Sequence, residues 1–523
     1  MNTKKLYLSL LLITMVSFLA IFFSGCKQED NKITSTQFVI NQDLIVLGTG
    51  RHLAPGEKDA YYCSKILGVW EPLITRDKEG FPAPALAQNW QMLDEGKVWI
   101  FYLRKDVIFH DGSKFNADAV IKNFDRMNKG IKRSMFYGMD INTYYPTLLK
   151  YEKLDEYTIK LTFKENNLNQ LYKMMDFGSA IFSPYCFNEN GDFNGVAIGT
   201  GPYKIVENQL NKYVKLQRFS NYYGEKAKIQ EIVVKNIPSV DSRYSALKSG
   251  EIFGVLDLNA IPPFLADELK NDDRFNISTN KSTMIRFLSL NGTKFPFNDI
   301  RMRQAVSLAI DRKNLVEALY LNYAKPTTNI LNYSSPYYMD IPVKYDLNKA
   351  KTLANEVLQG KRCEITYFIN GQEPLQKGEA ELIAYWLKDI GLDVKIQSLE
   401  YATMLHLVKK GEYNIARFQQ GLANGDPYGI FYSFMMPQGN RNKNECLGYK
   451  NQEVIDLLNK VKYIDNETTR RNIYNKLQEI STQEQPIVPL YNDESVVAYN
   501  KHLKNYEALV YGVDLAKIEW VDE

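Results

Sequence analysis

The segment Glu364-Ile-Thr-Tyr-Phe368 is the first of four consecutive segments that alternate in character. It is rich in β-branched and aromatic residues, which is typical of a strand, and so is Val394-Lys-Ile396. Each is followed by a segment with helical periodicity, at residues 378–390 and at residues 401–410. Strands that alternate with helices are typical of an α/β architecture, which we predict for the second half of the chain.

Both patterns recur outside this region. Asn116 and Asp299 are residues of the type that caps helices, and we expect helices from them to about Met127 and to Ile310. The first half is richer in strands and turns, so we expect mixed α+β structure there. We also predict strands at 98–103, 159–163 and 229–234, and helices at 347–358 and 467–481.

Length and charge set broad limits. The 523 residues are too many for one compact core, so two or more lobes are expected. The 64 basic and 61 acidic residues leave a net charge of only +3, which excludes a strong electrostatic case for binding nucleic acid. The 35 tyrosines suit surfaces that recognise a ligand, although large cores use them as well.

The N-terminus has the layout of a secretory signal. Two lysines precede an apolar run at 6–23, and Ser24-Gly25-Cys26 follows. This resembles a bacterial lipoprotein signal, which implies removal of residues 1–25, lipidation of Cys26 and a polar tether over 26–35. The alternative is an uncleaved transmembrane anchor, because the run is just long enough to span a bilayer. We therefore expect an extracytoplasmic protein that is lipid-anchored to the cell membrane.

Cysteines and histidines form no metal or redox motif. Beyond the signal, four widely spaced cysteines remain, none in a CxxC pair, and we expect mostly buried thiols. No two histidines lie three or four residues apart, so no helical metal pair exists. We predict neither a metal site built by the chain nor a resident cofactor. The residues are Cys63, Cys186, Cys363 and Cys446, and His52, His110, His406 and His502.

Three groups of short motifs follow one another along the chain. They are Pro84-Ala-Leu-Ala-Gln-Asn-Trp90 with Val107-Ile-Phe-His-Asp-Gly112; Ile198-Gly-Thr-Gly-Pro-Tyr203 with Asn221-Tyr-Tyr-Gly224 and Ala246-Leu-Lys-Ser-Gly-Glu251; and Phe297-Asn-Asp-Ile-Arg301 with Ala309-Ile-Asp-Arg312. In this order they resemble the extracellular peptide/nickel solute-binding proteins of ABC importers, family 5, over nearly the whole mature chain. The motifs themselves are typical of scaffold, since Gly199 and Gly201, for example, permit tight backbone geometry.

The resemblance implies two α/β lobes joined by a hinge, as in periplasmic binding proteins, with an extra domain on the first lobe. Lobe 1 would span residues 36–280, including the extra domain at about 75–200, and lobe 2 would span residues 281–490. Residues 491–523 would return to lobe 1. The lobes would close around a ligand by a hinge motion and pass it to the permease subunits of an ABC transporter, the protein itself being a monomer.

A basic loop bears on the cargo. Lys132-Arg133-Ser134-Met135-Phe136 is similar to a loop of the nickel-binding branch, which implies that Arg133 and Phe136 line a pocket for a metal chelate. An arginine suits this role because its planar fork pairs with the carboxylates of an organic chelator. The alternative is a solvated arginine on a basic surface.

A second loop bears on the choice between chelate and peptide. Peptide binders of the family carry an aspartate about here that takes the amino group of the peptide, whereas the nearest match is the neutral Asn424, with Asp426 close by. A buried amine without a counter-charge is costly, which weakens the peptide interpretation. In turn, aromatic residues usual in the nickel branch are replaced by Gly421 and Gly425, and no histidine follows Met436-Pro437. Both interpretations therefore stay open.

Two more residues are candidates for the pocket. Arg417 would supply a second positive charge from the opposite lobe, or else would be a surface residue at a strand edge. Cys63 falls where a methionine of the family often faces the ligand, and a buried, inert thiol is the alternative.

We predict a binding protein that captures a chelate of nickel or another transition metal outside the cell. The alternatives are an oligopeptide- or dipeptide-binding protein of a peptide importer and a peptide sensor. Ser245-Ala-Leu-Lys248 matches the SxxK motif of penicillin-recognising enzymes, but the partner motifs are missing. We therefore expect neither enzyme activity nor a catalytic residue.

Overall fold

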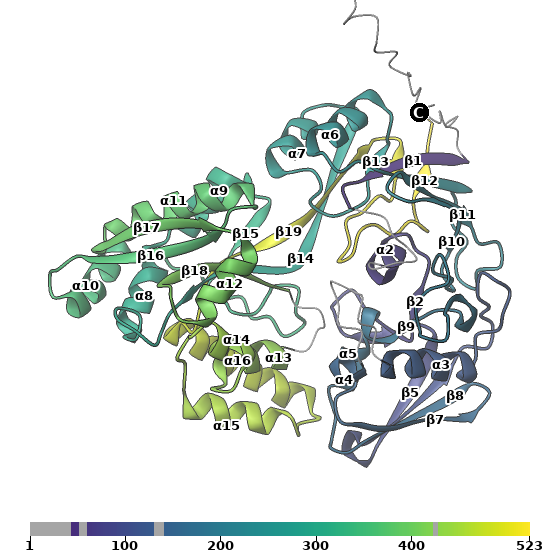
Figure 1. The fold of residues 1–523 in the computed structure, drawn as a ribbon, viewed down its shortest axis with the longest axis horizontal. Helices are drawn as coiled ribbons and strands as arrows, with labels where there is room; N and C mark the ends of the chain where they lie inside the picture. The colour runs from purple at the N-terminus through teal and green to yellow at the C-terminus, as the bar shows by residue number, and fades with distance from the viewer. Residues whose placement is uncertain (1–42, 52–59, 130–140, 422–426, 523) are drawn as a thin grey trace, which may run out of the picture. The chain divides into compact units, whose positions relative to one another are not determined.

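The computed structural model describes residues 43–51, 60–129, 141–421 and 427–522. Within them, eleven strands form one mixed sheet. These strands are β1 (Leu44–Thr49), β10 (Tyr203–Gln209), β11 (Tyr213–Arg218), β12 (Glu231–Asn236), β13 (Gly254–Val255), β14 (Phe275–Leu290), β15 (Ala324–Pro326), β16 (Cys363–Asn370), β17 (Leu392–Leu399), β18 (Ile415–Gly421) and β19 (Val488–Asn500). Their order across the sheet is β10-β11-β12-β1-β13-β19-β14-β18-β16-β17, with β15 beside β19 (Figure 1).

Two long antiparallel strands, β14 and β19, link the two ends of this sheet. Residues 275–281 of β14 pair with 494–500 of β19, and residues 284–290 of β14 pair with 415–421 of β18. The register between β14 and β19 shifts between Lys281 and Ile285. This irregularity lies next to the predicted crossings between the lobes near residues 280 and 490, whose exact positions remain a prediction.

Parallel strands stand on each side of the long pair. β1 is parallel to β12 and β13, and β16 is parallel to β17 and β18. Strands in parallel sheets are buried on both faces, which accounts for the apolar run Ile45-Val46-Leu47, at most 1% exposed. In the second half, α11 (Pro374–Lys388) follows β16 and α12 (Tyr401–Lys409) follows β17. The predicted α/β alternation is therefore confirmed.

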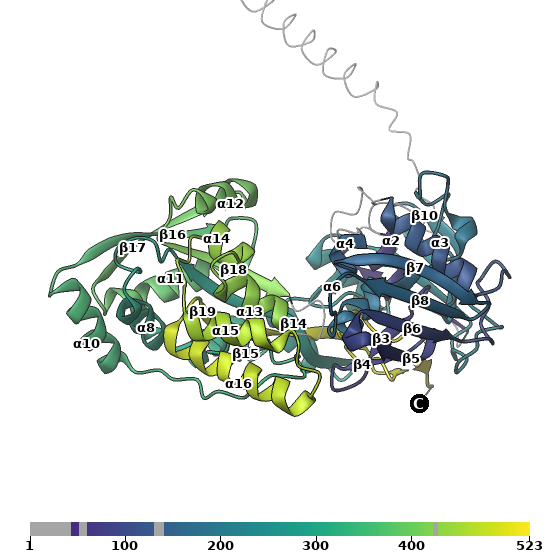
Figure 2. The same cartoon turned by 90° about the horizontal axis from the view of Figure 1, so that it is seen from below.

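A separate antiparallel sheet with the order β5-β6-β8-β7 lies within the region predicted as an extra domain (Figure 2). Its strands are β5 (Ala87–Leu93), β6 (Val98–Leu103), β7 (Leu148–Asp155) and β8 (Thr158–Phe163). The helix α3 (Ala117–Asn128) starts where expected, because the Asn116 side chain accepts a hydrogen bond from the amide of Ala119. Tyr151 of β7 donates its hydroxyl to Asp125 of α3 over 2.7 Å. The helix predicted from its capping residue and the strands predicted at 98–103 and 159–163 from their hydrophobic patterns are therefore confirmed as α3, β6 and β8.

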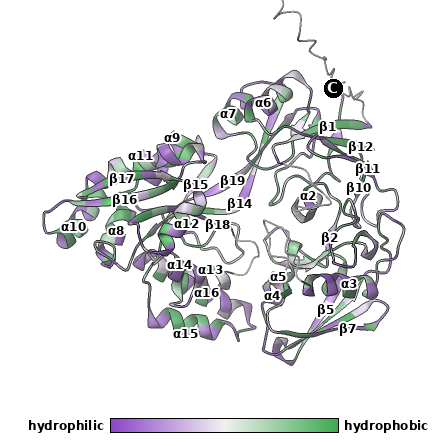
Figure 3. Cartoon of the chain, in the orientation of Figure 1, coloured by the Kyte–Doolittle hydropathy of each residue, from purple (hydrophilic) through white to green (hydrophobic). Residues whose placement is uncertain are grey.

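Helices cover the second half of the chain. They are α8 (Ile300–Ala309), α9 (Arg312–Tyr320), α10 (Leu347–Leu358), α13 (Tyr428–Met435), α14 (Asn440–Asn444), α15 (Gln452–Val461) and α16 (Glu467–Glu484). The predicted start at 378 is wrong by four residues for α11, because Pro374 occupies the first helical position, where proline is well tolerated. In Figure 3 hydrophobic and hydrophilic residues alternate along α15, whose Val454, Leu458 and Val461 are buried.

Shorter elements complete the chain. They are α2 (Ala60–Ile66), α4 (Ile141–Tyr144), α5 (Gln170–Met174), α6 (Val240–Ser249), α7 (Pro263–Lys270), β2 (Glu71–Pro72), β3 (Ile74–Arg76), β4 (Pro82–Pro84), β9 (Ala180–Ile181), β20 (Leu503–Lys504) and β21 (Glu519–Trp520). Near the C-terminus, Leu503, Tyr506 and Ile518 share a core with Ile45 and Leu47 of β1.

The motifs of the middle region act as scaffold. The carboxylate of Glu71 in β2 accepts hydrogen bonds from the hydroxyls of Thr200 at 2.9 Å and of Tyr222 and Tyr223 at 2.8 Å each. Burial raises the pKa of Glu71 above its ordinary value, although the three hydroxyls and Lys65 act against the rise. A single half-buried acid therefore joins two motifs that lie far from it in sequence.

Replacing Gly199 by alanine is expected to destabilise the fold by about 1–3 kcal/mol or more, because the chain passes here against another backbone. An added Cβ would lie 2.2 Å from the carbonyl oxygen of Val69 and 2.7 Å from Cα of Trp70. Gly429→Ala in α13 is the matched control, since its Cβ would meet nothing within 4 Å. Denaturant unfolding measures both, and equal midpoints for the two variants would contradict the expectation.

Candidate ligand-binding site

The strand order locates the candidate site. In open α/β sheets, ligands bind outside the carboxyl ends of parallel strands, at the point where the order of strands reverses. β1 lies between two parallel neighbours and is followed by Gly50 and Arg51, while β16 lies between two others and is followed by Gly371-Gln372-Glu373. The candidate site therefore consists of these two edges and the strands β14 and β19 that link them.

Aromatic rings and arginines gather beside the edge of β1. The guanidinium of Arg51 lies over the ring of Tyr62, 4.3 Å from its centroid. Tyr62 stacks on Phe177 with centroids 6.2 Å apart, and Phe177 meets Tyr511 edge to face at 5.1 Å. Arg76, which pairs with a buried aspartate, lies 5.5 Å from the centroid of Tyr511. The arrangement combines flat apolar faces with guanidinium groups, which suits a ligand bearing carboxylates.

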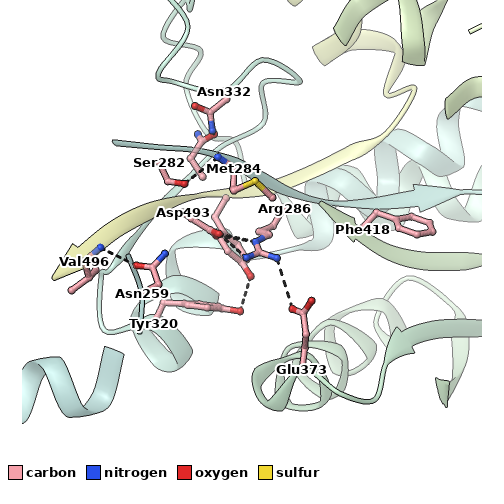
Figure 4. A network of polar contacts seen from close by, with 12 residues as sticks. Asn259, Ser282, Met284, Arg286, Tyr320, Asn332, Glu373, Phe418, Asp493 and Val496 are labelled. Carbon is pink, nitrogen blue, oxygen red and sulfur yellow. Dashed lines mark hydrogen bonds and ion pairs between the residues drawn. The ribbon is translucent and has the colours of Figure 1, made fainter. Parts of the chain in front are cut away.

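Arg286 and Asp493 join β14 to β19 where their register shifts (Figure 4). Nε of Arg286 donates to both carboxylate oxygens of Asp493, at 3.0 and 2.9 Å, and Nη2 lies 2.7 Å from Oδ2. Nη1 lies 3.8 Å from the nearer carboxylate oxygen of Glu373, which precedes α11. Burial acts to lower the pKa of Arg286, but Asp493 outweighs it, so the pKa stands above its ordinary value.

Arg417 of β18 belongs to a second hydrogen-bonded network, close enough to Arg286 to affect its pKa. Its Nε donates to Glu379 of α11 over 2.7 Å and its Nη2 donates to the hydroxyl of Tyr491 over 2.7 Å. The hydroxyls of Tyr491 and Tyr320 both donate to the same carboxylate, at 2.7 and 3.0 Å. Burial acts to raise the pKa of Glu379, but Arg417 and these donors hold it below its ordinary value. The charges of Arg417 and Glu379 cancel, and the two tyrosine hydroxyls are hydrogen-bonded within the network.

Arg441 holds the end of β18. Its Nη2 donates to the backbone oxygen of Gln419 at 3.0 Å and to Oε1 of Gln420 at 3.1 Å. It also pairs with the carboxylate of Glu445 and lies 5.6 Å from the ring centroid of Phe418. Arg441 therefore fixes the backbone at the end of β18, shortly before Asn424 and Asp426 in the sequence, which lie outside the described residues.

Comparison with known proteins identifies the family. The model of the middle region of the bacterial extracellular solute-binding proteins, family 5, matches residues 82–442. The chain belongs to this family. It is thus a solute-binding protein of an ABC importer and acts outside the cytoplasm, and the members of its family transport solutes rather than catalyse reactions.

Relatives of this family 5 protein bind different cargoes. Heme-binding protein A of Haemophilus influenzae is 27% identical over 460 residues, which cover 82% of this chain and 82% of the relative. The dipeptide-binding protein of Escherichia coli is 27% identical over 461 residues, 81% of this chain and 83% of the relative. The nickel-binding periplasmic protein of Escherichia coli is 26% identical over 392 residues, 71% of this chain and 73% of the relative.

Solved structures show the same fold. NikA from Brucella suis in complex with Fe(III)-EDTA matches with a TM-score of 0.79 at 21% identity, covering 91% of this chain and all 100% of that one. DppA from Helicobacter pylori in complex with the peptide STSA matches with a TM-score of 0.70 at 27% identity, covering 91% and 98%. The predicted two-lobed α/β fold of periplasmic binding proteins is confirmed.

The residues predicted for the site of this family 5 protein have different places. Arg417 is 3% exposed, so the interpretation as a surface residue is wrong, and its guanidinium is taken up by Glu379 and Tyr491. Cys63 lies in α2 at 2% exposure, as expected of a buried thiol. Contact of either residue with a ligand remains a prediction. Arg133, Phe136, Asn424, Asp426 and Cys26 lie outside the described residues.

Sequence reasoning missed Arg286, Glu373 and Arg441. One signal was available for Arg286, because it interrupts the apolar strand Met284-Ile-Arg-Phe-Leu288, and a charge in a buried strand requires a partner. The identity of that partner, 207 residues away, was not visible in the sequence.

Metal ligands and apolar helices in the part of the chain that the structure describes bear on the cargo and on membrane attachment. No group of three or more His, Cys, Asp or Glu side chains there is gathered as a metal-ion site. Among the described helices, none is both long enough and apolar enough to cross a bilayer.

Proposed function

We propose that this protein captures a chelate of nickel or another transition metal outside the cell and delivers it to the permease of its ABC importer. Lipid on Cys26 would hold it at the cell membrane. The observation that carries the proposal is the group of Arg51, Tyr62 and Tyr511 at the end of β1, whose two tyrosine rings pack on the buried Phe177. The aromatic rings would shield the bound chelate from water, and the guanidinium group would pair with the carboxylates of the chelator.

The loops on either side would complete the pocket. Arg133 and Phe136 would contact the chelate, as their similarity to the nickel-binding branch implies, and the loop of Asn424 and Asp426 would form the facing wall. The lobes at 36–280 and 281–490 would close by bending at the register shift of β14 and β19. Relatives that bind nickel, and the NikA structure with Fe(III)-EDTA, support this choice of cargo.

A di- or oligopeptide is the second candidate ligand. The peptide-binding relatives support it, and so does Glu373, a partly exposed carboxylate at the edge of β16. In that case the protein would serve a peptide importer or a peptide sensor, and Asp426 would be the residue to change next.

A thermal-shift screen of the full chain in detergent is expected to show stabilisation only by metal together with chelator. Nickel, cobalt and zinc would be tested alone, with L-histidine and with EDTA, beside a set of di- and tripeptides. Ligand at about 100 times its Kd stabilises the folded state by about 2.7 kcal/mol, which raises the melting temperature measurably. Chelator without metal is the control. Stabilisation by peptides alone would refute the chelate in favour of the peptide.

A further inference from the structure

We propose that Arg286, Glu373 and Gln419 form a subsite for the α-amino end of the ligand, that is, an amino group and the carbonyl or carboxylate oxygen next to it. The inference rests on the proposed function, because it names which part of the captured ligand meets this edge of the site.

The three residues come from three elements that meet at one edge. Arg286 of β14 is directly opposite Gln419 of β18 in the antiparallel register, so their side chains lie on the same face of the sheet. That face is covered by α11, since Arg417, two residues before Gln419, pairs with Glu379 of this helix. Glu373 is the residue immediately before α11.

Two buried atoms of this group have no hydrogen-bond partner. Nε and Nη2 of Arg286 are occupied by Asp493, but Nη1 is buried and donates to nothing. The backbone oxygen of Gln419 accepts from Arg441, but its side-chain Oε1 is buried and accepts from nothing. Leaving a buried polar atom unpaired is unfavourable, so an unpaired donor and an unpaired acceptor on directly opposite residues indicate a missing partner.

Glu373 adds an accessible carboxylate. Its side chain is 40% exposed, and its nearest charged partner, Nη1 of Arg286, is 3.8 Å away, beyond hydrogen-bond distance. Although Glu373 occupies the capping position of α11, its side chain does not cap the helix. The carboxylate thus lies near the unpaired Nη1 of Arg286 without a hydrogen bond to it.

The charges favour a positive group at this place. Asp493 and Glu379 neutralise Arg286 and Arg417 respectively, so Glu373 is left as the uncompensated charge of the cluster. A positively charged amino group donating to Glu373 and to Oε1 of Gln419 would balance it. The carbonyl or carboxylate oxygen of the same residue, three bonds from the amino nitrogen, would then accept from Nη1 of Arg286. One ligand end satisfies all three groups.

This chemistry is shared by peptides and by metal chelates of amino acids. A peptide presents an ammonium group and the first carbonyl oxygen, whereas a histidine chelate presents a metal-bound amine and a carboxylate. The experiment therefore needs both kinds of probe, each with a counterpart that lacks the α-amino group.

Titration calorimetry of the full chain in detergent tests the subsite. The probes are L-alanyl-L-alanine, its N-acetyl form, nickel with L-histidine, and nickel with EDTA. In Glu373→Gln the Kd for whichever amine-bearing probe the wild type binds is expected to rise about tenfold or more, since a hydrogen bond to a charged group is lost. The melting temperature and the Kd for N-acetyl and EDTA probes should stay unchanged.

Glu381→Gln is the matched control on the same helix, because Glu381 is 60% exposed and pairs only loosely with Lys377 at 3.9 Å. Its Kd values should equal those of the wild type. An unchanged Kd in Glu373→Gln, or an equal loss in both variants, would overturn the subsite and leave the two buried atoms to be bridged by water. Binding of only nickel with EDTA would overturn the subsite while the proposed function stands. Binding of only the N-acetyl peptide would overturn both the subsite and the proposed metal chelate. If the wild type binds none of the probes, the proposed function fails and the subsite with it.

Discussion

Replacing Arg417 by methionine is expected to lower the free energy of unfolding by about 3–5 kcal/mol, because it leaves a carboxylate buried without its counter-charge. The side chains of Arg417 and Glu379 are 2% and 0% exposed, and Nε lies 2.7 Å from the carboxylate. Urea unfolding at neutral pH measures the change. The double variant Arg417→Met/Glu379→Met should recover much of the loss, since it removes both charges together.

The pair of Arg362 and Asp393 provides the control. Its N–O distance is as short, at 2.5 Å, but the side chains are 49% and 47% exposed, so water screens the attraction. Arg362→Met is expected to cost less than about 1 kcal/mol. If Arg417→Met costs no more than Arg362→Met, the buried network does not stabilise the second half of the chain as argued.

Acidification from neutral pH to pH 4 is expected to cost about 3 kcal/mol of stability through His110 alone. Nε2 of His110 lies 2.9 Å from the carbonyl oxygen of Gly201, which only accepts, so Nε2 carries the proton of the neutral ring. Burial lowers the pKa of His110 to about 4, with Lys204 assisting, while the hydrogen bond to Gly201 and the charge of Asp111 oppose the shift. In the unfolded chain the pKa is about 6.5.

Between these two pKa values the unfolded chain binds a proton that the folded chain does not. The stabilisation is therefore complete above about pH 6.5 and is lost progressively as the pH falls toward 4, at about 1.4 kcal/mol per pH unit. His110→Gln keeps a donor for Gly201 without titrating, so its stability should decline less over this window. Urea midpoints of both proteins at several pH values give the comparison, and parallel profiles would exclude His110 as the cause.

Local structure was predictable where neighbouring residues decide it. The strand Val98–Leu103 and the helix Leu347–Leu358 were predicted at their exact bounds, and the Asn116 and Asp299 side chains cap the helices they were expected to cap. Each of these features depends on residues a few positions apart, which the sequence displays directly. The start of α11 was missed because Pro374 extends the helix beyond its periodic part.

The candidate site was predictable only in part, because motifs name candidate residues but do not show what those residues contact. Motif similarity identified the family and pointed to Arg133, Phe136 and the loop of Asn424 and Asp426, all of which lie outside the described residues. Arg417 was proposed as a source of a second positive charge in the pocket, but the sequence cannot show whether a guanidinium faces a ligand or a carboxylate such as Glu379. Only burial distinguishes the two cases.

The sequence by itself therefore determined the element pattern, the α/β class and the family of this protein. Tertiary structure alone decided which charges meet. Glu379 and Arg417 are 38 residues apart, Glu71 and Tyr223 are 152 apart, and Arg286 and Asp493 are 207 apart, and none of these pairs has a local signature. Such pairs form because long strands bring distant segments into the same low-dielectric interior, where every charge requires a partner.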